Sequence, residues 1–220
     1  MTAELTALFV SAFVTLFVVI DPPGCVPIFS SLTSGTSNAH RTAMAWRSVL
    51  IATGVLVAFA LGGEAFLGAL GISLAAFKIA GGVMVFLIAI DMVFEKRTQR
   101  RENRAEEVKS AAAAADKSLE VEDISVFPMA IPMLAGPGAI AAVMLLMSRA
   151  DGIEQSLTVL AALAAVLLLT LASLLAAGPL MRLMGHKIEA MITRLLGVIL
   201  AALAAQFIID GIRESFGLAG

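Results

Sequence analysis

The chain has 220 residues and a formal net charge of −2; 60% of its residues are hydrophobic and only 15% are charged. A mean hydropathy of +0.97 is far more apolar than a soluble domain of this length needs, so the composition indicates a protein that crosses the membrane several times. Because Cys25 is the single cysteine, an internal disulfide is excluded.

Six segments are apolar over the roughly 20 residues that a helix needs to cross a bilayer. They cover residues 5–29, 48–68, 72–93, 125–148, 156–177 and 194–212. We therefore predict an all-α membrane protein with six transmembrane helices. The first segment lacks a basic leading region and a small-residue cleavage site, so we interpret it as a retained helix and not as a signal peptide.

The first segment contains an unusual stretch, FVVIDPPGCVPIF, at residues 17–29. Proline has no backbone N–H and breaks helices, so Pro22 and Pro23 predict an interruption in this helix. In hydrocarbon, a broken backbone is tolerated only where it lies inside protein or lines a wet cavity. Asp21 adds an ionisable group at depth, and such groups usually mark a pathway or a site. A simple kink is the alternative.

Residues 95–123 hold seven Lys/Arg and eight Asp/Glu, so this segment cannot lie in the bilayer. It divides the chain into a first part at 1–94, a solvated linker at 95–123 and a second part at 124–220. Basic residues gather in the first, third and fifth connections, which by the positive-inside rule predicts a cytoplasmic linker and two termini on the opposite side.

The two parts of the chain are similar to each other. Pro23-Gly24 and Pro137-Gly138 are matched at an offset of 114, and the pairs Lys78/Arg194 and Gly81/Gly197 are matched at an offset of 116. Because each part has three segments, the second copy is inverted in the membrane. We predict two inverted three-helix repeats with helices one and four broken at Pro and Gly, an architecture of many secondary transporters.

The predicted site lies where these two breaks meet near the membrane midplane. We predict that the helices restart near Gly24-Cys25 and near Gly138-Ala139. Such a restart presents free N–H groups and a positive dipole end, which favour a carboxylate. Carbonyls without donors, or Asp21, would then take an ammonium group, so the pattern suits a zwitterion. The candidate substrate-binding residues are Asp21, Pro22, Pro23, Gly24, Cys25, Gly136, Pro137 and Gly138.

Other charged and small residues in the segments carry secondary expectations. Asp91 and Asp210 lie near helix ends and join Asp21 as candidate ion-coupling residues, although solvation at the helix ends is the simpler interpretation. We expect Lys78 to snorkel to the outer interface. Gly81-Gly82 and Gly197 are expected to allow close helix packing and not to contact substrate. No enzyme motif, cofactor fingerprint or metal-ligand spacing is present, so we expect neither catalysis nor a bound cofactor.

The motifs resemble those of a known family. Asp21-Pro22-x-Gly24-x-x-Pro27-x-Phe29 resembles the first motif of the MarC family of bacterial inner-membrane proteins, and FPMAIPMLAGPGAI at 127–140 resembles the second. FKIAGGVMVFLIAIDMVF and RLLGVILAALAAQFIIDGI resemble the third and sixth helices of that family. The resemblance implies a six-helix protein related to the LysE-type exporters, and transport of small neutral amino acids such as glycine and alanine, as in SnatA-type members. Family members often carry asparagine at the position of Asp21.

The leading hypothesis is thus a secondary transporter of small neutral amino acids, coupled to H⁺ or Na⁺. The residues leave three alternatives open. An ion or metal exporter would use Asp21, Asp91 and Asp210, an intramembrane protease would pair two aspartates, and an accessory membrane protein would dock a partner through the linker. Nucleic-acid binding is not expected, and a homo-oligomer is left open.

Overall fold

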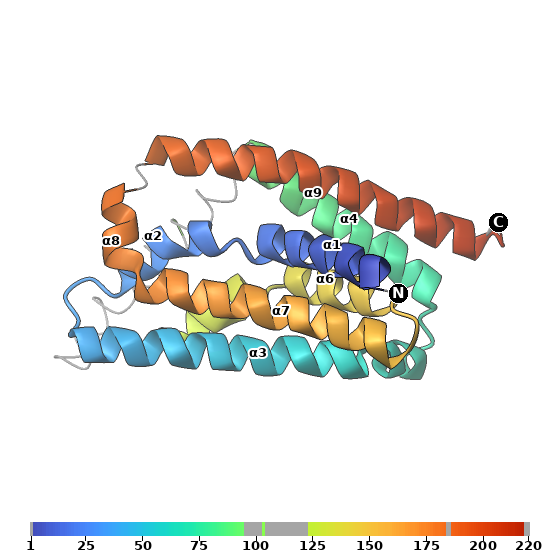
Figure 1. Ribbon diagram of the computed structural model, residues 1–220, viewed down its shortest axis with the longest axis horizontal. Helices are drawn as coiled ribbons and strands as arrows, with labels where there is room; N and C mark the ends of the chain where they lie inside the picture. Colours follow the sequence, from blue (N-terminus) through green and yellow to red (C-terminus); the bar gives the residue numbers. More distant parts are fainter. Residues whose placement is uncertain (1, 95–102, 104–122, 184–185, 218–220) are drawn as a thin grey trace.

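The computed structural model describes residues 2–94, 103, 123–183 and 186–217. All regular elements in these ranges are helical, as the sequence predicts (Figure 1). The helices of the first part are α1 (Thr2–Ile20), α2 (Pro22–Leu32), α3 (Asn38–Ala69) and α4 (Leu74–Val93). Those of the second part are η1 (Ser125–Leu134), α6 (Pro137–Met147), α7 (Gly152–Leu175), α8 (Ala177–Leu183) and α9 (His186–Ser215).

By length and composition, the described helices supply five stretches that can cross a membrane, and a sixth if η1 and α6 together form one bent span. The first stretch runs through α1 and α2, from Ala3 to Leu32. The multi-pass, all-helical prediction is therefore confirmed. The predicted linker lies outside the described residues except at positions 103 and 123, so its boundaries stay a prediction.

Helix α3 begins ten residues before the predicted segment at 48–68. Ser37 caps its N-terminus by accepting a hydrogen bond of 3.3 Å from the His40 N–H. The polar first turns of α3 continue the helix beyond its apolar part, which hydropathy alone does not register. At 1.5 Å per residue, 32 residues span about 48 Å, which is longer than the hydrocarbon core.

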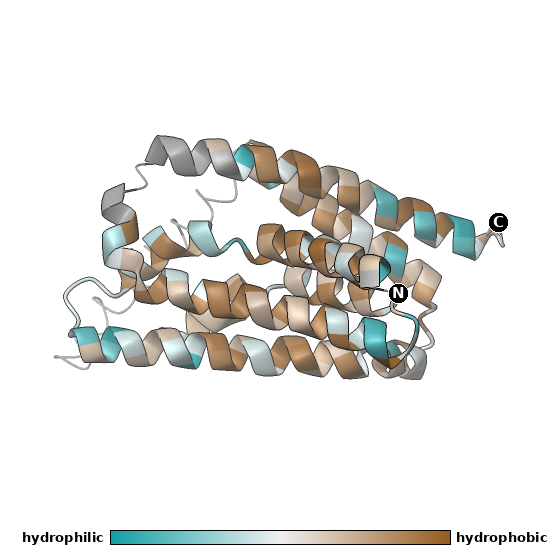
Figure 2. Ribbon diagram, in the orientation of Figure 1, coloured by the Kyte–Doolittle hydropathy of each residue, from teal (hydrophilic) through white to brown (hydrophobic). Residues whose placement is uncertain are grey.

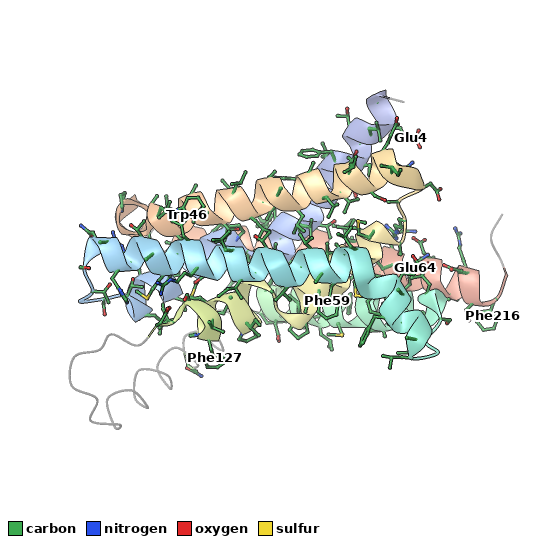
Figure 3. The ribbon with its side chains drawn as sticks, turned by 90° about the horizontal axis from the view of Figure 1, so that it is seen from below. Glu4, Trp46, Phe59, Glu64, Phe127 and Phe216 are labelled. Carbon is green, nitrogen blue, oxygen red and sulfur yellow. The ribbon has the colours of Figure 1, made fainter. Side chains whose placement is uncertain are left out.

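Polar residues gather at the two ends of the bundle and apolar residues along its length (Figure 2). Both termini lie at the same end, next to the α3–α4 and α6–α7 connections (Figure 1). Figure 3 places Glu64 and Phe216 toward that end and Trp46 toward the other. Large apolar side chains such as Leu50 (61% exposed) and Phe127 (54% exposed) face outward, as expected where lipid replaces water.

Helices α4 and α9 form the most extensive helix pair. Glycines allow their backbones to approach closely: a Cβ on Gly82 would lie 2.7 Å from Ile208 Cγ1 and 3.1 Å from the Ala204 carbonyl oxygen. A Cβ on Gly197 would lie 3.0 Å from Val93 Cγ2. The expectation that these glycines serve helix packing is confirmed.

Candidate functional site

The first break is a single residue wide. Helix α1 ends at Ile20, α2 starts at Pro22, and Asp21 between them has left-handed backbone angles, φ 58° and ψ 65°. The Asp21 N–H still donates to the Phe17 carbonyl at 2.9 Å, and the Cys25 N–H donates to the Asp21 carbonyl at 3.2 Å. The helical hydrogen-bond pattern therefore resumes within one turn, two residues earlier than the predicted restart at Gly24-Cys25.

The Asp21 carboxylate caps α2. Its Oδ1 accepts a hydrogen bond of 3.1 Å from the Gly24 N–H, and the residue is only 3% exposed. A Cβ on Gly24 would lie 2.8 Å from Asp21 Cγ, so glycine leaves the room that the carboxylate occupies. The positive end of α2 is thus filled by the chain's own anion. The Asp-x-x-Gly spacing is a capping signal that the sequence interpretation did not use.

Cys25 is fully buried behind this cap. Its thiol donates a weak hydrogen bond to the Ile20 carbonyl, with 3.6 Å between sulfur and oxygen. Pro22 and Pro23 occupy the first two positions of α2, where their missing N–H groups cost the helix nothing. The prolines therefore start a helix here as much as they end one.

The second break is wider and more irregular. Phe127 and Ile131 have extended backbone angles inside η1, and η1 and α6 are bent by 51°. Gly136 precedes α6, whose first residue is Pro137, one position before the predicted restart. The N-cap residue of α6 is Gly136, which has no side chain to cap this helix start. Gly138 and Ala139 are buried in the first turn, which therefore lacks an N-cap side chain such as that of Asp21 in α2.

The two breaks approach each other. A Cβ on Gly138 would lie 3.6 Å from Val19 Cγ1, two residues before Asp21, and would clash with Ile88 Cδ1 of α4. The start of α6 is therefore packed against the end of α1. The buried carboxylate of Asp21 and the uncapped start of α6 therefore lie on neighbouring segments of one core.

The other two candidate carboxylates lie elsewhere. Asp210 forms an ion pair with Arg149 and accepts a hydrogen bond of 2.7 Å from Gln206 Nε2. Arg149 also lies over the Phe207 ring, 4.1 Å from its centroid. Asp91 is half-buried near the end of α4. Among the described residues, no three His, Cys, Asp or Glu side chains come together as a metal site would require.

Lys78 has a partner that the sequence did not indicate. It is only 9% exposed, and its Nζ lies 2.6 Å from Glu214 Oε2, which belongs to a partly exposed side chain. The end of α9 passes the start of α4, so a glutamate from the far end of the sequence reaches this lysine. The structure thus adds an ion pair between α4 and α9, and the expectation that Lys78 snorkels to the outer interface stays a prediction.

A further ion pair joins the start of α3 to the segment before η1. Arg47 Nη1 lies 2.7 Å from Asp123 Oδ2, and Ser125 donates hydrogen bonds to Asp123 from both its hydroxyl and its N–H. The Ser125 hydroxyl is the main reason that the pKa of Asp123 lies below its ordinary value, with Arg47 acting in the same direction. This carboxylate is therefore a structural clamp at the end of the bundle away from the termini.

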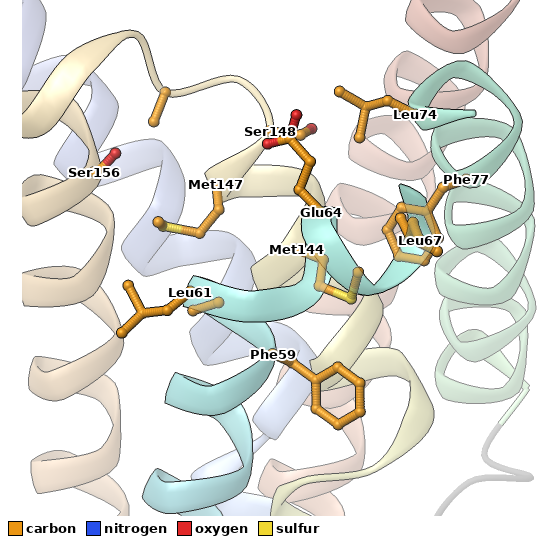
Figure 4. A pocket seen from close by; sticks show the side chains of 12 residues that line it. Phe59, Leu61, Glu64, Leu67, Leu74, Phe77, Met144, Met147, Ser148 and Ser156 are labelled. Atoms are coloured by element: carbon orange, nitrogen blue, oxygen red, sulfur yellow. The ribbon is translucent and has the colours of Figure 1, made fainter. Parts of the chain in front are cut away.

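A cavity of about 250 Å³ opens between α3, α4, α6 and α7 near the end where the termini lie. Figure 4 shows Glu64 and Ser148 at its upper side and Phe59, Leu67 and Phe77 around it. None of the eight predicted substrate-binding residues lines it. Glu64 is exposed at this opening, and the sequence interpretation did not single it out, because a glutamate near a helix end is ordinarily solvated surface.

Comparison with known proteins agrees with this architecture. The profile described as MarC family integral membrane protein matches residues 6–216. A UPF0056 membrane protein of Methanocaldococcus jannaschii is 38% identical over 205 residues, which cover 93% of this chain and 96% of that protein. YvbG of Bacillus subtilis, also a UPF0056 membrane protein, is 35% identical, with 94% and 95% covered. The UPF0056 inner membrane protein YhgN of Escherichia coli is 34% identical, with 93% and 95% covered. No solved structure matches the chain.

Proposed function

The chain belongs to the MarC family of integral membrane proteins, and on this premise we propose that it is a secondary transporter of small neutral amino acids such as glycine and alanine. It would resemble SnatA-type members and share ancestry with the LysE-type exporters. Transport would involve no chemical step on the substrate. The observation that carries the proposal is the meeting of two interrupted helices in one core, with a buried carboxylate on one and an uncapped start on the other.

The substrate would bind between Asp21 and the start of α6. Since the start of α2 already holds the Asp21 carboxylate, the uncapped first turn of α6 at Gly136, Pro137 and Gly138 is the better place for the substrate carboxylate. The ammonium group would face Asp21. A small substrate would fit best, because the side chains of Val19 and Ile88 lie close to the backbone at Gly138.

Helix packing supports the proposed inverted repeat. The contacts of Gly82 with Ala204 and Ile208 have counterparts at a single offset of 115: Gly197 contacts Ala89 and Val93. The packing of α1 on α7 likewise has a counterpart in the packing of η1 and α6 on α3. Gly197 is thus better matched to Gly82 than to Gly81, its partner in the sequence comparison.

Topology and energy coupling follow from the same proposal. The chain would lie in the inner membrane with its linker in the cytoplasm and both termini outside, since both termini share one end of the bundle. The inner-membrane description of YhgN supports this location. Asp21, Asp91 and Asp210 remain the candidates for coupling to H⁺ or Na⁺.

Uptake in proteoliposomes tests the proposal. Purified full-length protein should exchange radiolabelled glycine for internal glycine, and unlabelled alanine should compete. Gly138→Val should abolish exchange, because its side chain would clash with Ile88 and push α6 away from α1 and α4, whereas Gly62→Val should retain exchange because nothing lies within 4 Å of a Cβ there. If neither amino acid enters or competes, the substrate assignment is wrong. Cation flux under the same conditions would instead indicate an ion exporter, and no flux at all an accessory role.

A further inference from the structure

The polar side chains that line the cavity between α3, α4, α6 and α7 can all act as hydrogen-bond acceptors. Among the described residues that line it, Glu64 is the one with an ionisable side chain. The hydroxyl of Ser148 donates to the Leu145 carbonyl at 2.9 Å, and that of Ser156 donates to the Gly152 carbonyl at 3.0 Å. A serine hydroxyl that donates to a backbone carbonyl keeps the lone pairs of its oxygen as acceptors for a ligand. The side-chain polar groups of the cavity thus accept hydrogen bonds and favour a cationic donor.

The apolar lining points to the same ligand chemistry. Phe59 and Phe77 line the cavity, and aromatic faces attract ammonium groups. Arg149 stands between the lining residues Ser148 and Ala150, but its guanidinium is turned to Asp210 and Phe207 and does not line the cavity. No cationic side chain stands opposite Glu64 among the described residues that line the cavity.

Met144 of α6 is among the residues that line the cavity. A Cβ on Gly63 would lie 2.5 Å from Met144 Cε and 2.9 Å from Met144 Cγ, so the methionine side chain packs against this glycine of α3. Met144 is 7% exposed and lies seven residues beyond Pro137, which is about 10 Å along the helix. The cavity is therefore lined by the same helix that starts at the second break.

We propose that this cavity is a binding vestibule for small solutes that carry an ammonium group, recognised by Glu64 and the two serine oxygens. Its volume of about 250 Å³ is below that of most drug-binding pockets, which fits a small ligand. The inference deepens the proposed transport function by giving the substrate an entry site before the break. Ligand recognition in the vestibule, however, does not depend on which solute is transported.

Charge-selective cysteine labelling tests the proposal. In a Cys25→Ser background, Ser148→Cys places one thiol in the cavity of the full-length protein in detergent. Its rate of reaction with a cationic methanethiosulfonate should exceed the rate with an anionic one. Glu64→Gln should lower this rate ratio by about fivefold to tenfold, as expected for removal of one partly screened charge nearby. Ser156→Cys repeats the measurement from α7 if Ser148→Cys does not fold.

Two further measurements use a control thiol outside the cavity and a small ammonium ion as ligand. Ser215→Cys, exposed at the end of α9 and outside the cavity, should show a rate ratio that Glu64→Gln leaves unchanged. Ethylammonium should slow modification in the cavity, and propionate should not. A thiol that reacts with neither reagent, a ratio insensitive to Glu64→Gln, or equal protection by propionate overturns the proposal. These results are independent of glycine uptake, so vestibule and transport can fail separately.

Discussion

Substitution of Asp21 separates its role as a helix cap from its role as a charge. Asp21→Asn keeps a side-chain oxygen for the Gly24 N–H and a residue type that tolerates left-handed angles, so the free energy of unfolding should change by less than about 0.5 kcal/mol. Asp21→Ala loses the cap, at about 1 kcal/mol, and places an alanine at φ 58°, at about 1–2 kcal/mol more. Asp21→Gly loses the cap but removes the backbone penalty, so its cost should be a few tenths of a kcal/mol.

The expected order of stability is therefore aspartate and asparagine together, then glycine, then alanine. Loss of helical circular dichroism on heating in detergent should show a midpoint about 4–12 °C lower for Asp21→Ala, since a chain of this size shifts by roughly 2–4 °C per kcal/mol. Asp21→Asn also tests whether transport needs the negative charge. If this variant loses glycine exchange while its stability is unchanged, the charge of Asp21 is required for transport. Equal stability of the alanine and asparagine variants, or a glycine variant below alanine, would refute the capping argument.

Three further substitutions test the packing and the ion pairs by the same melting measurement. Gly82→Ala should cost about 1–3 kcal/mol, because its Cβ meets backbone and Ile208, while Gly54→Ala, with nothing within 4 Å, should be neutral or stabilising; equal effects would contradict the close packing of α4 on α9. Because the pKa of Asp123 is lowered in the folded protein, its stabilisation is present above the unfolded pKa of about 3.9 and is lost as the pH falls through the folded pKa. Ser125→Ala should reduce this loss of stability at low pH. An unchanged dependence of stability on pH would contradict the role of Ser125 in lowering the pKa of Asp123. Arg149→Met should lower the free energy of unfolding by about 1 kcal/mol, because it removes a partly exposed ion pair. No measurable change would mean that this pair does not stabilise the fold.

Several features of the fold follow from short stretches of sequence. The apolar segments predict the spans because burial in lipid depends on local composition over about 20 residues. Both breaks are predicted because a proline removes its own N–H whatever surrounds it. The exact residues at which the helices start were predicted less well. Pro22 and Pro137 begin their helices earlier than predicted, since proline is also a favoured first residue of a helix.

The candidate site was only partly predictable. The sequence placed Asp21 at the first break and Gly138 at the second, and the structure brings Gly138 against Val19 beside that aspartate. That Asp21 caps its own helix depends on left-handed backbone angles, which no propensity assigns to aspartate alone. The vestibule around Glu64 was missed because four helices contribute to it, and none of them marks it on its own.

The sequence by itself determined that this chain is a helical membrane protein, because hydropathy acts along the chain, and its motifs carried the resemblance to the MarC family. It also predicted interruptions near Asp21 and Gly136, because a proline removes its own N–H wherever it stands. The tertiary structure alone decided which charged side chains form ion pairs with one another. Lys78 and Glu214 are separated by 136 positions, and Arg149 and Asp210 by 61. Such pairs form only when helix crossing brings distant ends together, and the crossing of α4 with α9 is set by where glycines let two backbones touch.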